Sequence, residues 1–204
     1  RRKRRALTED ELTRLLETAR QRPLEDAMTI RRGKRRGQLA ANVSEERKAQ
    51  LELLGHERAL IYKTYLLTGL RKGELASLTV AQLELDSPTP YASLAAADEK
   101  NRQGSDIPLR ADLVIELRVW LAGKLSRLQD EARTAGDPIP LRLPPDTPLF
   151  YVPTGLLKIL DRDLAAAGIP KTDDRGRTVD IHALRHTFGT HLSKAGVAPR
   201  VAQA

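Results

Sequence analysis

The sequence contains no cysteine, which excludes a disulfide framework, a thiolate nucleophile and any metal site with thiolate ligands. Aromatic residues make up only 3% of the 204 residues, which argues against a single-strand binder that stacks bases on aromatic side chains. No apolar run reaches the roughly 20 residues of a membrane span. No apolar stretch follows the basic start, as it would in a secretory signal. We therefore expect no membrane partner and a reducing, cytoplasmic location.

Positive charge is what the sequence has in excess. Lys and Arg number 35 against 27 Asp and Glu, so the net charge is +8, with 40% hydrophobic residues. This balance is typical of a globular domain and favours a polyanionic partner such as nucleic acid. Residues 1–5 are all basic, and we interpret them as a linker that lies along nucleic acid or, alternatively, is solvated and unpartnered. Residues 31–37 form a second basic cluster with glycine breaks, typical of a mobile loop.

The two ends predict that the sequence is a piece of a longer protein. The first residue is Arg1 rather than Met, and Ala204 lies in what reads as a new helix with Pro199 in its first turn. We expect a basic linker over residues 1–7 and one domain over residues 8–204.

Apolar residues recur at helical spacing along most of the chain. Thr8 and Glu11 form the capping-box pattern of a first helix, which Pro23 is expected to end, and Ser44 is positioned to cap the next. The helices predicted are 8–22, 44–54, 56–67, 72–78, 111–132, 154–167 and 181–195. Short strands are expected between residues 80 and 109. The predicted class is mainly α with a small antiparallel β-sheet (α+β).

His182 and Arg185 lie three residues apart and share one face of the last predicted helix. Leu184 and Phe188 are expected to point into the core. An imidazole beside a guanidinium on an exposed face suits an anion, although such a pair is often only a solvated surface.

Arg71 follows Thr68-Gly69-Leu70 at a tight connection between two predicted helices. A helix start offers unpaired N–H groups that favour anions. Glu74 is positioned to brace Arg71 or its neighbours by an ion pair. Lys100 lies just before a turn at residues 101–104, at the tip of a predicted hairpin. Taken singly, each motif is also compatible with an ordinary surface.

Together these motifs resemble the catalytic domain of the tyrosine recombinase (phage integrase) family. The resemblance runs from about Thr8 to the end of the chain. It is carried by Arg71 in Thr-Gly-Leu-Arg-Lys-Gly-Glu-Leu, by Lys100 before the strand ending Ile107-Pro108-Leu109, and by His182-Ala183-Leu184-Arg185-His186. Lys72 and Arg102 are alternatives for the lysine.

The resemblance implies metal-independent DNA cleavage and rejoining through a 3′-phosphotyrosyl intermediate, with no cofactor. Without a metal ion, cationic side chains must stabilise the charge that builds on the scissile phosphate. Two arginines suit this role, because each stays charged and offers a planar fork of donors. The resemblance therefore assigns Arg71 and Arg185 to the scissile phosphate.

The remaining roles follow from the same resemblance. Lys100 would protonate the leaving 5′-oxygen, and His182 would help to deprotonate the attacking hydroxyl or hold the phosphate. Glu74 and His186 would support the site, His186 by bonding within the fold. DNA contacts are expected from a larger basic set: Arg1, Arg2, Lys3, Arg4, Arg5, Lys72 and Arg102.

The nucleophilic tyrosine of the family follows the His-x-x-Arg helix, and no tyrosine of this chain does. Tyr62, Tyr65, Tyr91 and Tyr151 all precede His182. The resemblance also implies double-stranded DNA as partner, a homotetramer on DNA for the longer protein, and a bacterial or phage-derived origin. Residues 31–58 are longer than the connection typical of the family and have no functional interpretation.

Three other interpretations remain open. A DNA-binding module without catalysis would explain the charge. A metal nuclease would need clustered carboxylates, and Asp98-Glu99 and Asp173-Asp174 lie on polar loops without a partner set. A helical protein-interaction domain would explain the helices but not the order of the four motif residues.

Overall fold

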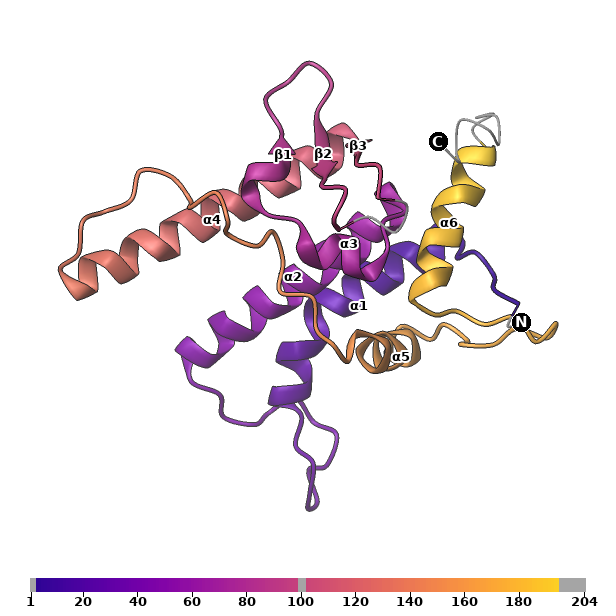
Figure 1. The fold of residues 1–204 in the computed structure, drawn as a ribbon. Coiled ribbons are helices and arrows are strands. Elements are labelled where there is room, and N and C mark those ends of the chain that lie inside the picture. The colour runs from indigo at the N-terminus through magenta and orange to yellow at the C-terminus, as the bar shows by residue number, and fades with distance from the viewer. Residues whose placement is uncertain (1–2, 99–101, 195–204) are drawn as a thin grey trace. The chain divides into compact units, whose positions relative to one another are not determined.

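A computed structural model describes residues 3–98 and 102–194 of the chain (Figure 1). The chain divides into two compact units. The helical unit comprises Arg1–Leu66 and Pro153–Ala204, and the sheet unit comprises Leu67–Val152. The domain boundaries predicted from the sequence, a basic linker over residues 1–7 and one domain over residues 8–204, stay a prediction. The class is confirmed, because the fold is mainly helical with one small antiparallel sheet.

The helical unit begins with α1 (Glu9–Met28), which has the predicted capping box. The Thr8 side chain accepts from the Glu11 backbone N–H, and the Glu11 carboxylate accepts from the Thr8 N–H. The prediction that Pro23 ends this helix was wrong. Pro23 is buried inside α1, and the helix continues to Met28 because packing outweighs the hydrogen bond that proline lacks.

Helix α2 (Glu45–Thr68) is one continuous helix where two had been predicted. Its start is capped by Ser44, whose hydroxyl accepts from the Arg47 N–H at 3.3 Å. The apparent break, Gly55, lies where the α2 backbone touches α1. A Cβ added there would lie only 1.9 Å from the Arg20 carbonyl oxygen. Glycine therefore serves close helix packing here rather than helix termination.

A buried carboxylate joins three helices of this unit. Asp163, on α5 (Leu156–Ala166), is fully buried and accepts hydrogen bonds from the Tyr62 hydroxyl at 2.7 Å and from Arg22 Nε at 2.5 Å. Arg58 lies within 3.5 Å of the same oxygen as Arg22. A buried charge is stable only when it is paired and hydrogen-bonded, and here the partners of Asp163 come from α1 and α2, so the cluster links these helices to α5. The last helix of the unit is α6 (Ile181–Lys194).

The sheet unit contains α3 (Lys72–Ser77), a 3₁₀ turn η1 (Val80–Gln82), three strands and α4 (Ala111–Ala135). The strands β1 (Leu83–Glu84), β2 (Tyr91–Leu94) and β3 (Ser105–Pro108) pair antiparallel in chain order. Tyr91 pairs with Pro108, and Leu94 pairs with Ser105. Helix α4 buries Leu113, Leu117 and Trp120, as its periodicity predicted. The indole of Trp120 donates to the Leu149 carbonyl at 2.9 Å.

The helices of the described residues include none that is long and apolar enough to cross a membrane. The described residues also include no group of three or more His, Cys, Asp or Glu side chains that could hold a metal ion.

Candidate functional site

The exposed face of α6 carries the predicted His-x-x-Arg motif. His182 and Arg185 are both exposed, whereas Ala183, Leu184 and Thr187 are fully buried on the opposite face. Burial of Leu184 agrees with the sequence prediction, and Phe188 is half-buried. The helix therefore presents an imidazole and a guanidinium on the same exposed side. Such a pair can accept an oxyanion.

The start of α6 is held by Asp180, a residue that sequence reasoning missed. Its Oδ1 accepts from the Ala183 N–H at 2.9 Å, which caps the helix, and both carboxylate oxygens accept from Arg4 Nε at 2.9 and 3.0 Å. Burial opposes ionisation of Asp180. The hydrogen bonds from Arg4 and Ala183 and the nearby positive charges outweigh that burial and lower its pKa. An aspartate directly before a predicted helix indicates an N-cap, so this role of Asp180 could have been predicted from the sequence. Nothing in the sequence indicated its pairing with Arg4.

Residues 3–7, the N-terminal segment, lie against the helical unit. The Thr178 N–H donates to the Lys3 carbonyl at 2.9 Å, and the Leu7 N–H donates to Thr187 Oγ1 on α6 at 3.0 Å. Leu7 itself is buried. The segment expected to be a linker therefore contacts the helix that carries the predicted catalytic pair.

The side chains of Arg4 and Arg5 are engaged within the fold. Arg4 pairs with Asp180, while the Arg5 guanidinium donates to both oxygens of Glu11 at 2.7 and 2.8 Å and to the Pro170 carbonyl. These contacts compete with the DNA contacts predicted for both arginines, which stay predictions. Arg1 and Arg2 lie outside the described residues.

Arg71 is the residue that precedes α3 in the sheet unit. Glu74, which is buried, accepts from the Arg71 backbone N–H at 2.7 Å and from its guanidinium at 2.5 Å. The sequence predicted an ion pair of Glu74 with Arg71 or its neighbours, and the partner is Arg71. One carboxylate therefore holds both the backbone and the side chain of Arg71, which leaves the guanidinium partly exposed. Lys72, the first residue of α3, is half-buried.

The predicted hairpin is present as β2 and β3, but its predicted general acid is not described. Lys100 lies outside the described residues, so its role stays a prediction. Arg102 is described and exposed, with a positive φ of 53° that is uncommon for a residue other than glycine. Arg102 therefore stays an alternative for the lysine of the motif.

The predicted catalytic residues belong to different units. Arg71 lies in the sheet unit, whereas His182 and Arg185 lie in the helical unit. Their convergence on a single phosphate therefore stays a prediction. His186 is exposed on α6, and its backbone carbonyl accepts from the Thr190 hydroxyl at 2.9 Å. The supporting role of the His186 side chain also stays a prediction.

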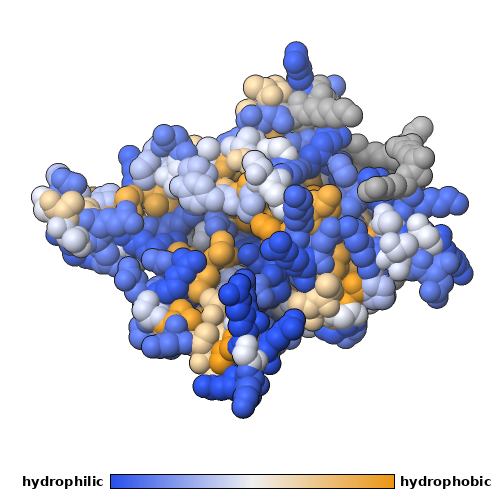
Figure 2. Space-filling model, turned by 90° about the horizontal axis from the view of Figure 1, so that it is seen from below, coloured by the Kyte–Doolittle hydropathy of each residue, from blue (hydrophilic) through white to orange (hydrophobic). Residues whose placement is uncertain are grey.

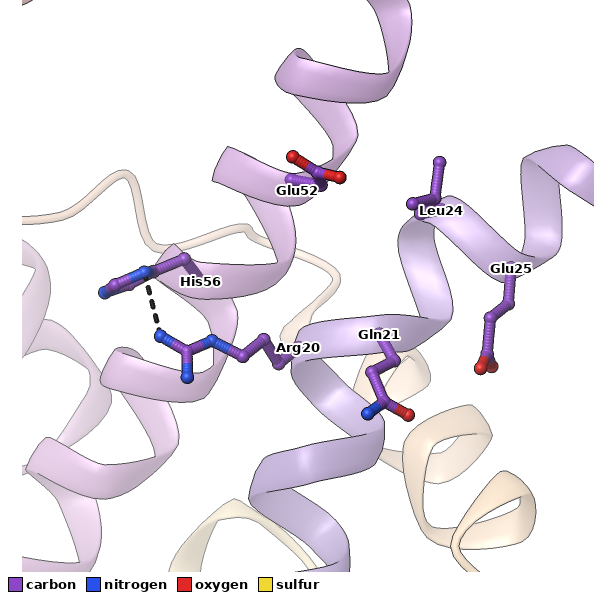
Figure 3. A pocket seen from close by; sticks show the side chains of 6 residues that line it. All are labelled: Arg20, Gln21, Leu24, Glu25, Glu52 and His56. Atoms are coloured by element: carbon purple, nitrogen blue, oxygen red, sulfur yellow. Dashed lines mark hydrogen bonds between the residues drawn. The ribbon is translucent and has the colours of Figure 1, made fainter.

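A cavity of about 390 Å³ lies between α1 and α2 in the helical unit (Figure 3). Its six lining residues are Arg20, Gln21, Leu24, Glu25, Glu52 and His56. Arg20 donates to His56 Nδ1 at 3.1 Å across it. None of the residues predicted to be functional lines this cavity, so it does not belong to the predicted phosphate site.

The four tyrosines differ in access to solvent. Tyr62 and Tyr65 are fully buried, and burial raises the pKa of both hydroxyls well above the ordinary range, helped in Tyr62 by the charge of Asp163. A buried phenol with a raised pKa is a poor nucleophile. Tyr91 is half-buried on β2, and Tyr151 is exposed with the Lys124 ammonium 5.0 Å from its ring centroid.

Known families and structures resemble this chain over most of its length. The model described as the phage integrase family matches residues 5–204. The fold is similar to the crystal structure of XerA recombinase, with a TM-score of 0.59 and 19% identity, covering 98% of this chain and 54% of that one. It is also similar to XerH site-specific recombinase in a post-cleavage complex with palindromic difH substrate. That match has a TM-score of 0.58 and 18% identity, and it covers 98% and 45% of the two chains.

A pre-cleavage complex of XerH with difH substrate matches at a TM-score of 0.59 and 17% identity, covering 100% of this chain and 47% of that one. The chain thus spans about half the length of these recombinases. Among curated proteins, no sequence matches this chain.

Proposed function

This chain belongs to the phage integrase family, and we propose on that basis that it acts in site-specific DNA recombination. The reaction proposed cleaves and rejoins DNA strands through a 3′-phosphotyrosyl intermediate, without a metal ion. The observation that carries the proposal is the exposed His182 and Arg185 pair on α6, whose opposite face is buried.

The chemistry proposed follows from the charges on the site residues. A tyrosine hydroxyl attacks a backbone phosphate, the O–P bond to the 5′-oxygen breaks, and that oxygen takes a proton. Arg185 and Arg71 would donate to the non-bridging oxygens, where charge builds during the attack. His182 would assist removal of the tyrosine proton or hold the phosphate, and Lys100 would protonate the leaving oxygen.

Glu74 supports this proposal because it fixes the position of Arg71 while part of the Arg71 side chain stays exposed to solvent. Its carboxylate accepts from the backbone and guanidinium of Arg71, whose side chain remains 35% exposed. A guanidinium anchored at one edge can still donate from its other edge to a phosphate. Glu74 is therefore proposed to orient Arg71.

We propose that none of the four tyrosines of this chain is the nucleophile. Tyr62 and Tyr65 are inaccessible, and neither Tyr91 nor Tyr151 follows the His-x-x-Arg helix. We further propose that the partner is double-stranded DNA and that recombination requires a homotetramer. The XerH structures are complexes with difH substrate, which is consistent with that partner.

The test uses the full gene product that contains this sequence and a labelled suicide duplex that traps a covalent adduct. We expect covalent retention of the label in EDTA. Arg71→Ala or Arg185→Ala should lower retention by about 100-fold or more, since each removes a donor to the transition state. DNA binding should fall far less. Arg175→Ala, at an exposed turn, is the matched control and should retain activity.

Three outcomes for the full gene product would contradict this proposal in whole or in part. Strand cleavage that survives both Arg71→Ala and Arg185→Ala would show that these arginines are not the catalytic donors. A wild type that binds the duplex but forms no covalent adduct would leave a DNA-binding module as the function. Cleavage that is lost in EDTA and restored by a divalent cation would indicate a metal nuclease. For the 204-residue chain alone, an adduct on Tyr91 or Tyr151, detected by mass spectrometry, would overturn the assignment of the nucleophile.

A further inference from the structure

The connection between α1 and α2 carries a concentrated positive charge that the proposed site does not use. Residues 31–36 include five cations: Arg31, Arg32, Lys34, Arg35 and Arg36. No Asp or Glu occurs anywhere from residue 27 to residue 44. The local charge is therefore uncompensated along the chain.

This segment is a built hairpin, which we call the basic hairpin (residues 29–39). Thr29 and Leu39 pair across it, the Ile30 N–H donates to the Gln38 carbonyl at 2.9 Å, and the Gly37 N–H donates to the Ile30 carbonyl at 2.8 Å. Gly33 and Gly37 have φ of 80° and 88°, in the left-handed region that favours glycine. The backbone thus holds the five cations in a defined turn.

The base of the hairpin is tied to α1. The Thr29 N–H donates to the Glu25 carbonyl at 2.8 Å, and the Ala41 N–H donates to the Met28 carbonyl at 2.8 Å. The ribbon extends away from the ends of α1 and α2 (Figure 1). Cations on an anchored projection lose less conformational entropy on binding than cations on a free chain.

All five cationic side chains of the basic hairpin are exposed. Within residues 3–98 and 102–194, none of them pairs with a carboxylate, and Arg35 Nε donates only to the neutral Gln38 side chain at 3.1 Å. In the view from the side to which the ribbon of the hairpin points in Figure 1, strongly hydrophilic side chains project among smaller hydrophobic areas (Figure 2). Like charges held this close repel one another, and a polyanion would relieve that repulsion.

We infer that the basic hairpin is a second contact to the sugar–phosphate backbone of double-stranded DNA, on a different element from the predicted catalytic face of α6. The inference rests on the proposed function, which supplies the DNA. Duplex DNA carries about one negative charge per 1.7 Å of its axis, so one turn of cations meets several phosphates. Arginine forks suit phosphate oxygens in particular.

The composition of the hairpin favours backbone contact over base stacking. No aromatic residue occurs from residue 27 to residue 44, so no side chain there can stack on an unpaired base. The contact is therefore expected to add affinity without sequence preference, and its strength should depend steeply on salt.

The test compares two fourfold variants of the whole chain. The hairpin variant carries Arg31→Gln, Arg32→Gln, Lys34→Gln and Arg36→Gln, and it keeps Arg35 for its bond to Gln38. The control variant neutralises four exposed cations elsewhere: Arg142→Gln, Lys158→Gln, Arg162→Gln and Arg175→Gln. Both lose the same charge, so a general electrostatic effect is matched. Affinity for a labelled DNA duplex is measured between about 50 and 200 mM salt.

We expect the hairpin variant to bind duplex DNA at least tenfold more weakly than the control variant at about 100 mM salt. Its slope of log K against log salt should be shallower than that of the wild type by about 2 to 4, from about 0.9 per lost phosphate contact. A charge-preserving variant, Arg31→Lys, Arg32→Lys and Arg36→Lys, should bind within a few-fold of the wild type. That rescue separates lost charge from a misfolded hairpin.

Three outcomes would overturn the inference. If the hairpin and control variants bind DNA equally, the hairpin does not contact DNA, although the proposed function stands as long as the wild type binds. If only duplex RNA binding falls in the hairpin variant, the partner is RNA. If the wild type itself does not bind DNA, both the inference and the proposed function are wrong.

Discussion

Two basic segments look alike in the sequence and have opposite environments in the fold. In the N-terminal segment, Arg4 and Arg5 donate to the carboxylates of Asp180 and Glu11, and their side chains are only 25% and 10% exposed. In the basic hairpin, the cations are exposed and pair with no carboxylate in the described part of the chain.

The difference shows that a run of arginines does not define a nucleic-acid surface. Asp180 lies 176 positions after Arg4, and only the folded chain brings the two together. Once paired, an arginine contributes to packing and helix position, and its positive charge is largely cancelled. The hairpin cations lack this compensation and so remain available to an external anion.

The largest predicted contrast between the two segments is in stability. Arg5→Gln should lower the free energy of unfolding by about 2 to 3 kcal/mol, because Glu11 loses two charge-assisted hydrogen bonds and keeps only the one from the Thr8 N–H. Arg32→Gln should change it by less than about 0.5 kcal/mol, as is usual at an exposed position. Urea unfolding followed by circular dichroism measures both. Equal effects would mean that the two segments do not differ as described.

The next prediction separates the two tasks of Asp180. Asp180→Ala removes both the helix cap and the partner of Arg4 and should destabilise the protein by about 2 kcal/mol. Asp180→Asn keeps the capping oxygen and should have roughly half that effect. Hydrogen exchange of the Ala183 amide should quicken in the alanine variant only. Faster exchange in both variants would show that the cap depends on the ion pair.

The pH dependence of stability should also distinguish the segments. Hydrogen bonds from Arg4 and Ala183 overcome burial and lower the pKa of Asp180 in the folded protein. A lowered folded-state pKa stabilises the protein above the unfolded value of about 3.9, and this stability is lost as the pH falls through the folded-state pKa. The stability difference between wild type and Asp180→Asn should therefore be constant from about pH 5 to 7 and shrink below about pH 4. The stability difference between wild type and Arg32→Gln should not change with pH between about pH 4 and 7. A change over that range would contradict the conclusion that Arg32 has no carboxylate partner.

The smallest predicted effect concerns DNA binding by single arginines. Arg32→Gln should make the salt slope of DNA binding shallower by about 0.9, whereas Arg4→Gln should leave it unchanged because Asp180 already neutralises Arg4. Fluorescence anisotropy titrations at several salt concentrations measure the slope. A shallower slope for Arg4→Gln would instead support the DNA contact that the sequence predicted for Arg4.

Much of the fold could be predicted because its signals are local. The capping box at Thr8 and Glu11 and the apolar period of α4 each involve residues close in sequence. The errors came where distant contacts override local preference. Pro23 lies inside α1 because the helix is packed against its neighbours, and Gly55 lies inside α2 because Arg20 leaves no room for a side chain.

The candidate site was predictable to the extent that its motifs are contiguous. His182 and Arg185 share a face because helical geometry places residues three apart on one side. The pairing of Arg71 with Glu74 spans only one turn and was also predicted. The Arg4 contact with Asp180 and the Leu7 contact with Thr187 had no local signal, since each joins residues about 180 positions apart.

Spacing along the chain is enough to specify helix faces, caps and the order of the reactive side chains, because these depend on backbone geometry within a few residues. Spacing does not determine whether a charged side chain is paired or exposed. That depends on which carboxylate folding brings within hydrogen-bond distance and on how much water is excluded there. Arg4 and Arg32 both lie in runs of basic residues. In the folded chain, Arg4 pairs with Asp180 at the start of α6, whereas Arg32 stays exposed without a carboxylate partner among the described residues.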